Sequence, residues 1–341
     1  QLKQIGKDKP SQSLMYAKLS PDGKKVGYVS NHNIYTEDID SGNTIALTTN
    51  GNRQLINGTF DWVYEEELGC RDGFRWSGDS KNIAYWQVDA TGTRDYLMLN
   101  TTDSIYSFVI PVEYPKVGQS PSSVRIGVVS AAGGNTRWMN IPGDAKQHYL
   151  PRMEWAAGNQ SLIVQQLNRK QNESKLYVCN ISDAAAKNIY TETDKAWIDI
   201  KSRWNDDDPR GWEWVNNGTA FLWVSEKDGW RHIYHVSSNG KKETLLTKGN
   251  YDIETISAID EKNNDVYFIA SPENAIQRYL YRTKMDGKGK LELVSPANLK
   301  GTHGYEISPG ARLALHTFTN RNTPLVSEWI KLPEHRPLQD N

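Results

Sequence analysis

The feature that most constrains the fold is a short unit that recurs along the chain. Each copy has an apolar strand, a turn rich in Ser, Asn, Asp and Gly, and a second apolar strand. The copies lie at residues 16–30, 74–87, 153–166, 212–225, 256–271 and 305–319. A β-sandwich also has many short strands, but it would not repeat one turn chemistry in this way. Internal repetition indicates a repeat architecture.

A second strand pair with a short polar turn follows several of these copies, at residues 33–51, 175–194, 232–250 and 279–296. Two pairs make four strands in about 45 to 60 residues, which is the size of a propeller blade. No helical periodicity extends beyond a turn or two. The sequence therefore predicts an all-β protein, a β-propeller of about six to seven four-stranded blades that occupies residues 1–341. The stretched segment at 114–141 is expected to add strands.

The Pro and Gly residues of the turns fit the backbone conformations that tight turns require. Pro21 presets φ, and Gly23, Gly78 and Gly218 can adopt positive φ. The chain also has 12 Trp and 17 Tyr against 6 Phe. Such amphipathic aromatic side chains suit strands that are only half buried.

The bulk properties exclude some classes of partner. A net charge of -1 gives no basic face for nucleic acid. No apolar run approaches the roughly 18 to 20 residues of a membrane span. The chain opens on Gln1 without a signal-peptide pattern, so we expect a mature or trimmed piece of a longer protein.

The cysteines and histidines predict no metal and no cofactor. Cys70 and Cys179 are expected to be free thiols, although one disulfide between them stays possible. No Cys/His spacing resembles a zinc site. His232 and His235 are three apart in an expected strand, so they should point to opposite faces.

The acidic segment FDWVYEEELGCRDG at 60–73 does not fit the repeat. Three consecutive glutamates can simply form a solvated turn. Here Trp62 and Tyr64 precede them and should anchor the segment, and adjacent carboxylates repel unless a cation lies between them. A short helix would let two carboxylates converge on one ammonium group. Charge-assisted hydrogen bonds of this kind are worth about 1.5 to 3 kcal/mol each.

These residues carry a family resemblance. DWVYEEEL at 61–68 resembles the double-glutamate motif of the dipeptidyl peptidase IV family of serine exopeptidases. YPKVGQSPS at 114–122 and SEKDGWRHIYHV at 225–236 are similar to two later segments of that family, in the same order and at similar spacing.

The resemblance implies a fold and a site. In that family an eight-bladed propeller caps an α/β-hydrolase domain, and two glutamates bind the α-ammonium group of a peptide, so that dipeptides are released after proline or alanine. By position in the motif, Glu66 and Glu67 take this role, and Glu65 faces elsewhere. The partners are then peptide N-termini and the hydrolase domain of the parent chain, with a homodimer possible and a periplasmic or extracellular location expected.

The sequence departs from the family in its arginines. Residues 1–52 contain no Arg, whereas the family uses one before the glutamates to hold the substrate. Lys7 and Lys9 cannot reproduce a bidentate fork. A later loop of the family contributes aromatic and arginine side chains, for which Arg203 and Trp204 are the candidates here. A solvated acidic loop with one packed Trp is an equally good interpretation.

The catalytic elements of the family are also missing. No Gly-x-Ser-x-Gly elbow occurs in the sequence, and the resemblance stops at residues 331–341, where the hydrolase domain should begin. We expect a propeller shortened at its N-terminus, without a catalytic Ser-Asp-His set and inactive alone. A prolyl tripeptidyl or related aminopeptidase is the alternative within the enzyme class. A non-catalytic propeller that serves as a binding scaffold is the alternative of another class.

Overall fold

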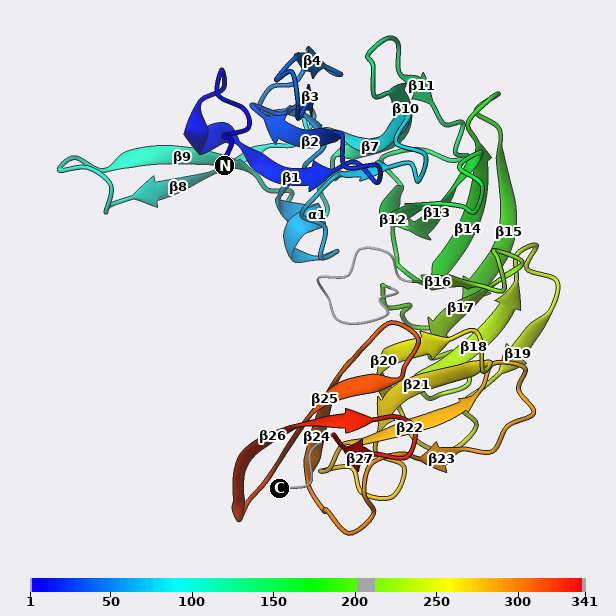
Figure 1. Ribbon diagram of the computed structural model, residues 1–341. Helices are drawn as coiled ribbons and strands as arrows, with labels where there is room; N and C mark the ends of the chain where they lie inside the picture. Colours follow the sequence, from blue (N-terminus) through cyan, green and yellow to red (C-terminus); the bar gives the residue numbers. More distant parts are fainter. Residues whose placement is uncertain (1, 201–211, 339–341) are drawn as a thin grey trace. The chain divides into compact units, whose positions relative to one another are not determined.

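The computed structural model describes residues 2–200 and 212–338, which fall in two compact units, Gln1–Ile200 and Lys201–Asn341 (Figure 1). Each unit is a series of small antiparallel sheets. The prediction of one shortened domain over 1–341 stays a prediction. None of the described helices is long and apolar enough to span a bilayer.

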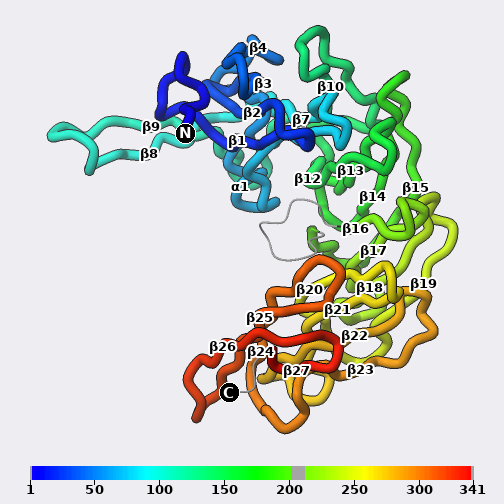
Figure 2. Tube along the Cα trace, in the orientation of Figure 1, coloured from blue at the N-terminus to red at the C-terminus, as the bar shows by residue number. Residues whose placement is uncertain are grey.

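The first unit holds three larger sheets in chain order, visible as successive groups of strands along the trace (Figure 2), and a separate two-stranded hairpin. The 3-10 helix η1 (Ser11–Ser13) precedes the first, which is formed by β1 (Met15–Leu19), β2 (Lys25–Ser30), β3 (Asn33–Asp38) and β4 (Thr44–Ala46). The second contains β5 (Leu55–Asn57), β6 (Phe74–Trp76), β7 (Asn82–Asp89), β10 (Ser123–Ser130) and β11 (Arg137–Trp138). The third contains β12 (His148–Trp155), β13 (Ser161–Asn168), β14 (Glu173–Asn180) and β15 (Ala186–Thr193).

The second unit repeats the four-stranded pattern three times. Its first sheet contains β16 (Trp212–Val215), β17 (Ala220–Ser225), β18 (His232–Ser237) and β19 (Glu243–Leu245). The next contains β20 (Ile253–Asp260), β21 (Asp265–Ala270), β22 (Tyr279–Lys284) and β23 (Glu292–Leu293). The last contains β24 (Thr302–Ile307), β25 (Leu313–Asn320), β26 (Thr323–Lys331) and β27 (Arg336–Pro337).

The six predicted copies each form the first two strands of one of these six sheets or, in the second, its β6–β7 pair. The second strand of a sheet is buried on both faces in most cases, as in β17 and β21, where every residue is buried. A strand covered on both sides reads as a continuous apolar run, which is why the repeat is visible in the sequence.

The segment at 114–141 was expected to add strands, and it does. β10 and β11 extend the second sheet from β7. The true insertion is the hairpin of β8 (Asp95–Asn100) and β9 (Phe108–Glu113), whose strands pair only with each other.

The same turn chemistry recurs between strands. Ser20 Oγ accepts from the Lys25 N–H at 2.9 Å and donates to Asp22 at 2.6 Å. Ser77 makes the corresponding bonds in the second sheet. Gly23 and Gly218 adopt positive φ as predicted, at 70° and 78°.

The prediction for Gly78 is wrong, because Ser80 takes the left-handed position there, at φ 62°. Gly78 serves a close approach instead. Its N–H donates to Asn159 Oδ1 at 2.8 Å, and a Cβ on Gly78 would lie 3.1 Å from that oxygen.

Candidate functional site

The acidic segment forms the single described α-helix, α1 (Trp62–Glu66), between β5 and β6. Asp61 caps it, because its carboxylate accepts from the Tyr64 N–H at 3.1 Å. Ser122 donates to the other Asp61 oxygen at 2.6 Å. Burial raises the pKa of Asp61, and these hydrogen bonds oppose that shift. The start of the helix is therefore fixed from two sides.

Buried contacts anchor the underside of α1. Tyr64 is 1% exposed, and its hydroxyl accepts from the Leu150 N–H at 3.0 Å. Two residues further along β12, buried Arg152 donates to the Leu68 carbonyl at 2.8 Å. The Phe60 ring stacks on Tyr64 with centroids 5.5 Å apart. Tyr64 and Leu68, on either side of the glutamates, are thus tied to β12.

The three glutamates face different surroundings. Glu65 is half-buried, and burial raises its pKa, with Arg71 opposing the shift. Glu65 in turn contributes to the raised pKa of Tyr16, so it faces β1. Glu66 and Glu67 are exposed at the C-terminal end of the helix. The expectation that Glu65 faces elsewhere stays a prediction.

Among the described residues, neither Glu66 nor Glu67 has a side-chain hydrogen bond or a basic ion-pair partner within 4 Å. Most partly buried carboxylates of this unit do have such a partner, as Asp72 does with Arg75 at 3.0 Å. Two adjacent negative charges without a neighbouring cation create a potential that attracts one.

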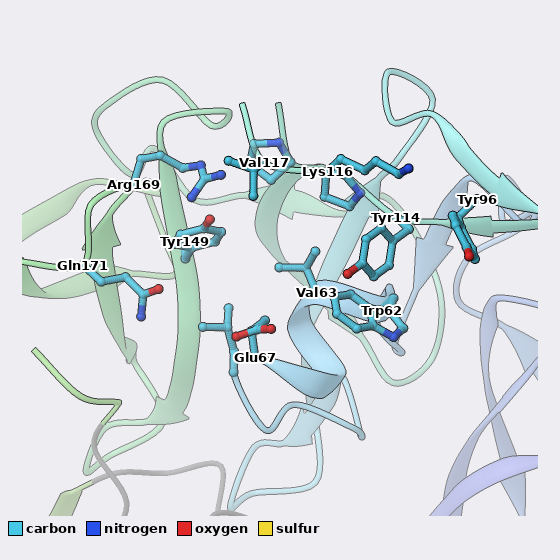
Figure 3. Close-up of a pocket in the computed structure, with 13 residues that line it drawn as sticks. Trp62, Val63, Glu67, Tyr96, Tyr114, Lys116, Val117, Tyr149, Arg169 and Gln171 are labelled. Atoms are coloured by element: carbon cyan, nitrogen blue, oxygen red, sulfur yellow. The ribbon is translucent and has the colours of Figure 1, made fainter. Parts of the chain in front are cut away.

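A cleft of about 820 Å³ lies beside the helix within the first unit. Glu67 lines it, whereas Glu66 is exposed without lining it. Figure 3 shows Glu67, Tyr149 and Arg169 around the same space, from the C-cap of α1, from β12 and from the segment after β13. The volume is that of a site for a small molecule or a few residues of peptide.

One wall of the cleft is aromatic. The Trp62 and Tyr114 rings lie 4.3 Å apart, and Tyr114 lies 5.7 Å from Tyr96 (Figure 3). Tyr114 begins the Tyr-Pro-Lys segment, all of which lines the cleft. The structure therefore brings two of the three resembling segments to one place. The third, at 225–236, lies in the second unit.

Arg169 is a cleft residue that the sequence analysis missed. Its guanidinium lies 5.5 Å from the centre of the Tyr149 ring. Burial raises the pKa of Tyr149, Arg169 lowers it, and Glu67 raises it further. Arg169 follows the glutamates by about a hundred residues in the sequence, so a search of the segment before them could not find it.

Among the described arginines, Arg169 alone lines the cleft. Arg53, the first Arg of the chain, binds Asp95 at 2.9 Å and also Glu113. The predicted substrate residues Arg203 and Trp204 lie outside the described residues.

The repeated antiparallel sheets are those of a propeller, and the inserted acidic helix borders a cleft with aromatic and charged residues. A model of the dipeptidyl peptidase IV (DPP IV) N-terminal region matches residues 1–325. The chain belongs to this family, and the predicted β-propeller fold is confirmed.

Individual relatives agree. The chain is 28% identical over 296 residues to inactive dipeptidyl peptidase 10 of Rattus norvegicus, covering 83% of this chain and 36% of that protein. It is 26% identical to dipeptidyl peptidase 4 of Trichophyton tonsurans, covering 96% and 42%. The crystal structure of Porphyromonas gingivalis dipeptidyl peptidase 4 superposes with a TM-score of 0.85 at 29% identity, covering 96% of this chain and 45% of that one. The chain thus spans less than half the length of these relatives.

Proposed function

We propose that this chain is the substrate-gating propeller of a serine exopeptidase like dipeptidyl peptidase IV, which releases N-terminal dipeptides. Glu66 and Glu67 bind the α-ammonium group of the peptide, and the hydrolase domain of the parent chain cuts it. The observation that carries the proposal is a pair of exposed carboxylates without a basic partner, on a helix fixed from below and beside a cleft.

The geometry of α1 supports this role. Consecutive helical residues point about 100° apart, and each glutamate has three side-chain torsions, so both carboxylates can reach one ammonium group beside the helix end. Peptide side chains seldom offer such a group next to a backbone carbonyl, whereas a free N-terminus always does. A fixed ammonium site sets the distance to the cut, which is what an exopeptidase requires.

The cleft supplies groups for the rest of the dipeptide. The aromatic wall of Trp62, Tyr114 and Tyr96 can pack against an apolar side chain. We assign Arg169 to a peptide carbonyl, since the guanidinium is a strong donor that cannot lose its proton.

The test uses the full-length protein and a Gly-Pro-linked reporter. Replacing both acids (Glu66→Gln with Glu67→Gln) should lower kcat/KM by about 100-fold or more, because two charge-assisted hydrogen bonds are lost. The matched control is Glu65→Gln, which removes a carboxylate from the same helix and should leave turnover nearly unchanged. Equal turnover of all three proteins would refute the assignment.

Two alternatives remain, and each makes a different prediction. A prolyl tripeptidyl or related aminopeptidase would release tripeptides, so it would cut a reporter with three residues before the scissile bond in preference to the Gly-Pro-linked one. The similarity to an inactive dipeptidyl peptidase keeps open a non-catalytic binding propeller. In that case the full-length protein would bind a peptide through Glu66 and Glu67 without cutting it.

A homodimer is a second part of the proposal, supported by the β8–β9 hairpin. Four consecutive residues of β8 are exposed, including Leu97 at 64% and Leu99 at 64%. An isolated hairpin with apolar side chains on both faces is marginal in water and needs a cover. Leu97→Lys with Leu99→Lys should convert a dimer into a monomer in light scattering, and an unchanged mass would count against this role of the hairpin.

We also propose a periplasmic or extracellular location, which rests on the family resemblance alone. Fractionation of cells that express the full-length gene tests it, and recovery in the cytoplasmic fraction would contradict it.

A further inference from the structure

The last sheet brings together three of the seven histidines of the chain. Tyr305 on β24, His316 on β25 and Glu328 on β26 are direct cross-strand partners. Cross-strand partners lie on one face of a sheet, and His303, two residues before Tyr305, shares that face. His335 joins them from the segment between β26 and β27. We call these five residues the histidine cluster.

The cluster is closed at one end and open at the other. His303 and His316 are 2% and 1% exposed, whereas the Glu328 side chain is 35% exposed. Buried imidazoles must place their ring nitrogens in hydrogen bonds, because an unpaired buried polar group costs about 1–3 kcal/mol.

The hydrogen bonds of the cluster fix where the protons are. His303 Nε2 lies 2.9 Å from the Leu299 carbonyl, which can only accept, so Nε2 carries a proton. In a neutral ring, Nδ1 of His303 is then an acceptor. His316 Nε2 lies 2.9 Å from that Nδ1 and must therefore donate to it. Neutral His316 consequently has its lone pair on Nδ1.

That lone pair faces a carboxylate. His316 Nδ1 and Glu328 Oε1 lie 2.9 Å apart. Both atoms are acceptors when the imidazole is neutral and the acid ionised, so the contact is repulsive unless a positive charge lies between them. The row of hydrogen bonds therefore lacks one positive charge, a proton or a metal ion, between His316 and Glu328.

A third ligand is close by. The His335 ring lies 4.5 Å from the His316 ring, at 80° to it. One nitrogen each of His316 and His335 and one oxygen of Glu328 all lie within 4.8 Å of one another. The Tyr305 hydroxyl lies 2.9 Å from His335 Nε2 and holds that ring in place. A proton between His316 and Glu328 would involve only these two residues, whereas a metal ion could also engage His335.

We propose that His316, Glu328 and His335 bind a divalent first-row transition metal ion, of which Zn²⁺ is the example. Two imidazoles and one carboxylate are a common ligand set for Zn²⁺, and the exposed side of Glu328 leaves a fourth position for water. Tetrahedral ligands at 2.0–2.2 Å from a metal are about 3.4 Å apart. In the structure, His316 Nδ1 and Glu328 Oε1 are 2.9 Å apart and all three ligand atoms lie within 4.8 Å of one another, so binding requires the side chains to adjust to this spacing.

The surroundings match those of known metal ligands. A metal-bound histidine usually donates its other N–H to an acceptor that orients the ring. His316 does so to His303, which in turn donates to Leu299. With a metal on His316 Nδ1, the hydrogen bonds from His316 to His303 and from His303 to Leu299 can both be made by neutral imidazoles. The ion would tie β25, β26 and the segment before β27 together.

The experiment titrates the full-length protein, first stripped with a chelator, with Co²⁺. Tetrahedral Co²⁺ with nitrogen and oxygen ligands absorbs visibly, and Zn²⁺ should displace it. We expect one Co²⁺ per chain in the cluster and a rise in the unfolding midpoint. Glu328→Gln and His335→Gln should each weaken binding by about 100-fold. Both side chains are partly exposed, so the variants should fold.

The matched control is His235→Gln, a partly buried histidine of the same unit on β18, which should bind Co²⁺ like the parent protein. Absence of a visible band would overturn the proposal and leave a proton as the cation of the cluster. Equal Co²⁺ affinity of Glu328→Gln and the His235→Gln control would overturn it too.

Discussion

The C-terminal end of α1 and the histidine cluster both hold negative charge, but they differ in what surrounds it. At α1, Glu66 and Glu67 are exposed and lack a basic partner among the described residues. In the cluster, His303 and His316 place all four ring nitrogens in contacts of 2.9 Å. An exposed charge on a fixed support can receive a ligand from outside. A buried row of hydrogen-bonded side chains that lacks one positive charge indicates an ion bound inside the fold.

At α1, the residues that support the site differ from the residues that face the ligand. Asp61 caps α1 and the buried Tyr64 ties it to β12, whereas Glu66 and Glu67 are exposed. In the histidine cluster, the same residues form the hydrogen bonds that support the fold and face the proposed ion. Substitutions in the two regions should therefore affect stability and binding differently.

The largest effect is expected for the support of α1. Tyr64→Ala should lower the free energy of unfolding by about 3–5 kcal/mol, because it leaves a buried cavity and removes the bond to Leu150. Glu66→Gln with Glu67→Gln should change it by less than about 0.5 kcal/mol. Urea unfolding checks both. If the double glutamine variant lost as much stability as Tyr64→Ala, Glu66 and Glu67 would support the fold, which contradicts their assignment as ligand-facing residues.

A smaller effect is expected in the cluster. His316→Ala in the presence of a chelator should lower the free energy of unfolding by about 1–3 kcal/mol, because His303 Nδ1 loses its partner inside the fold. The same urea measurement applies. A change below about 0.5 kcal/mol would mean that the hydrogen-bond chain contributes nothing to the fold.

The smallest effect is expected for the cleft arginine. Arg169→Met should raise KM by about tenfold with kcat nearly unchanged, since an exposed guanidinium binds substrate and transition state alike. Arg169→Lys keeps the positive charge but not the bidentate guanidinium, so its KM should lie between those of the parent protein and Arg169→Met. Steady-state kinetics of the full-length protein decide this, and a loss confined to kcat would assign Arg169 to the reaction itself.

Much of the fold could be predicted, because strands buried on both faces produce apolar runs that repeat. β17 and β21 read directly from the sequence. The acidic helix was also predictable, since Trp62, Tyr64 and the three glutamates lie within six consecutive positions. The left-handed residue of the second turn was not, because Ser80 replaces a glycine there.

The remaining site residues depend on contacts between distant segments. Arg169 reaches the cleft only because β12 and β13 lie beside α1. His316, Glu328 and His335 are twelve and seven residues apart, and strand register brings them together. No short spacing motif could indicate them, which is why the sequence predicted no metal site. The sequence identified charges that are neighbours in the chain and missed those that become neighbours in the sheet.

The most direct test of the central claim compares two reporters, one with a free and one with an acetylated N-terminus, on the full-length protein and its double glutamine variant. Acetylation removes the ammonium charge, and the variant removes the two carboxylates that we assign to it. We expect acetylation to lower kcat/KM by about 100-fold or more in the parent protein and by only a few-fold in the variant. An equal loss in both proteins would show that Glu66 and Glu67 do not recognise the peptide N-terminus.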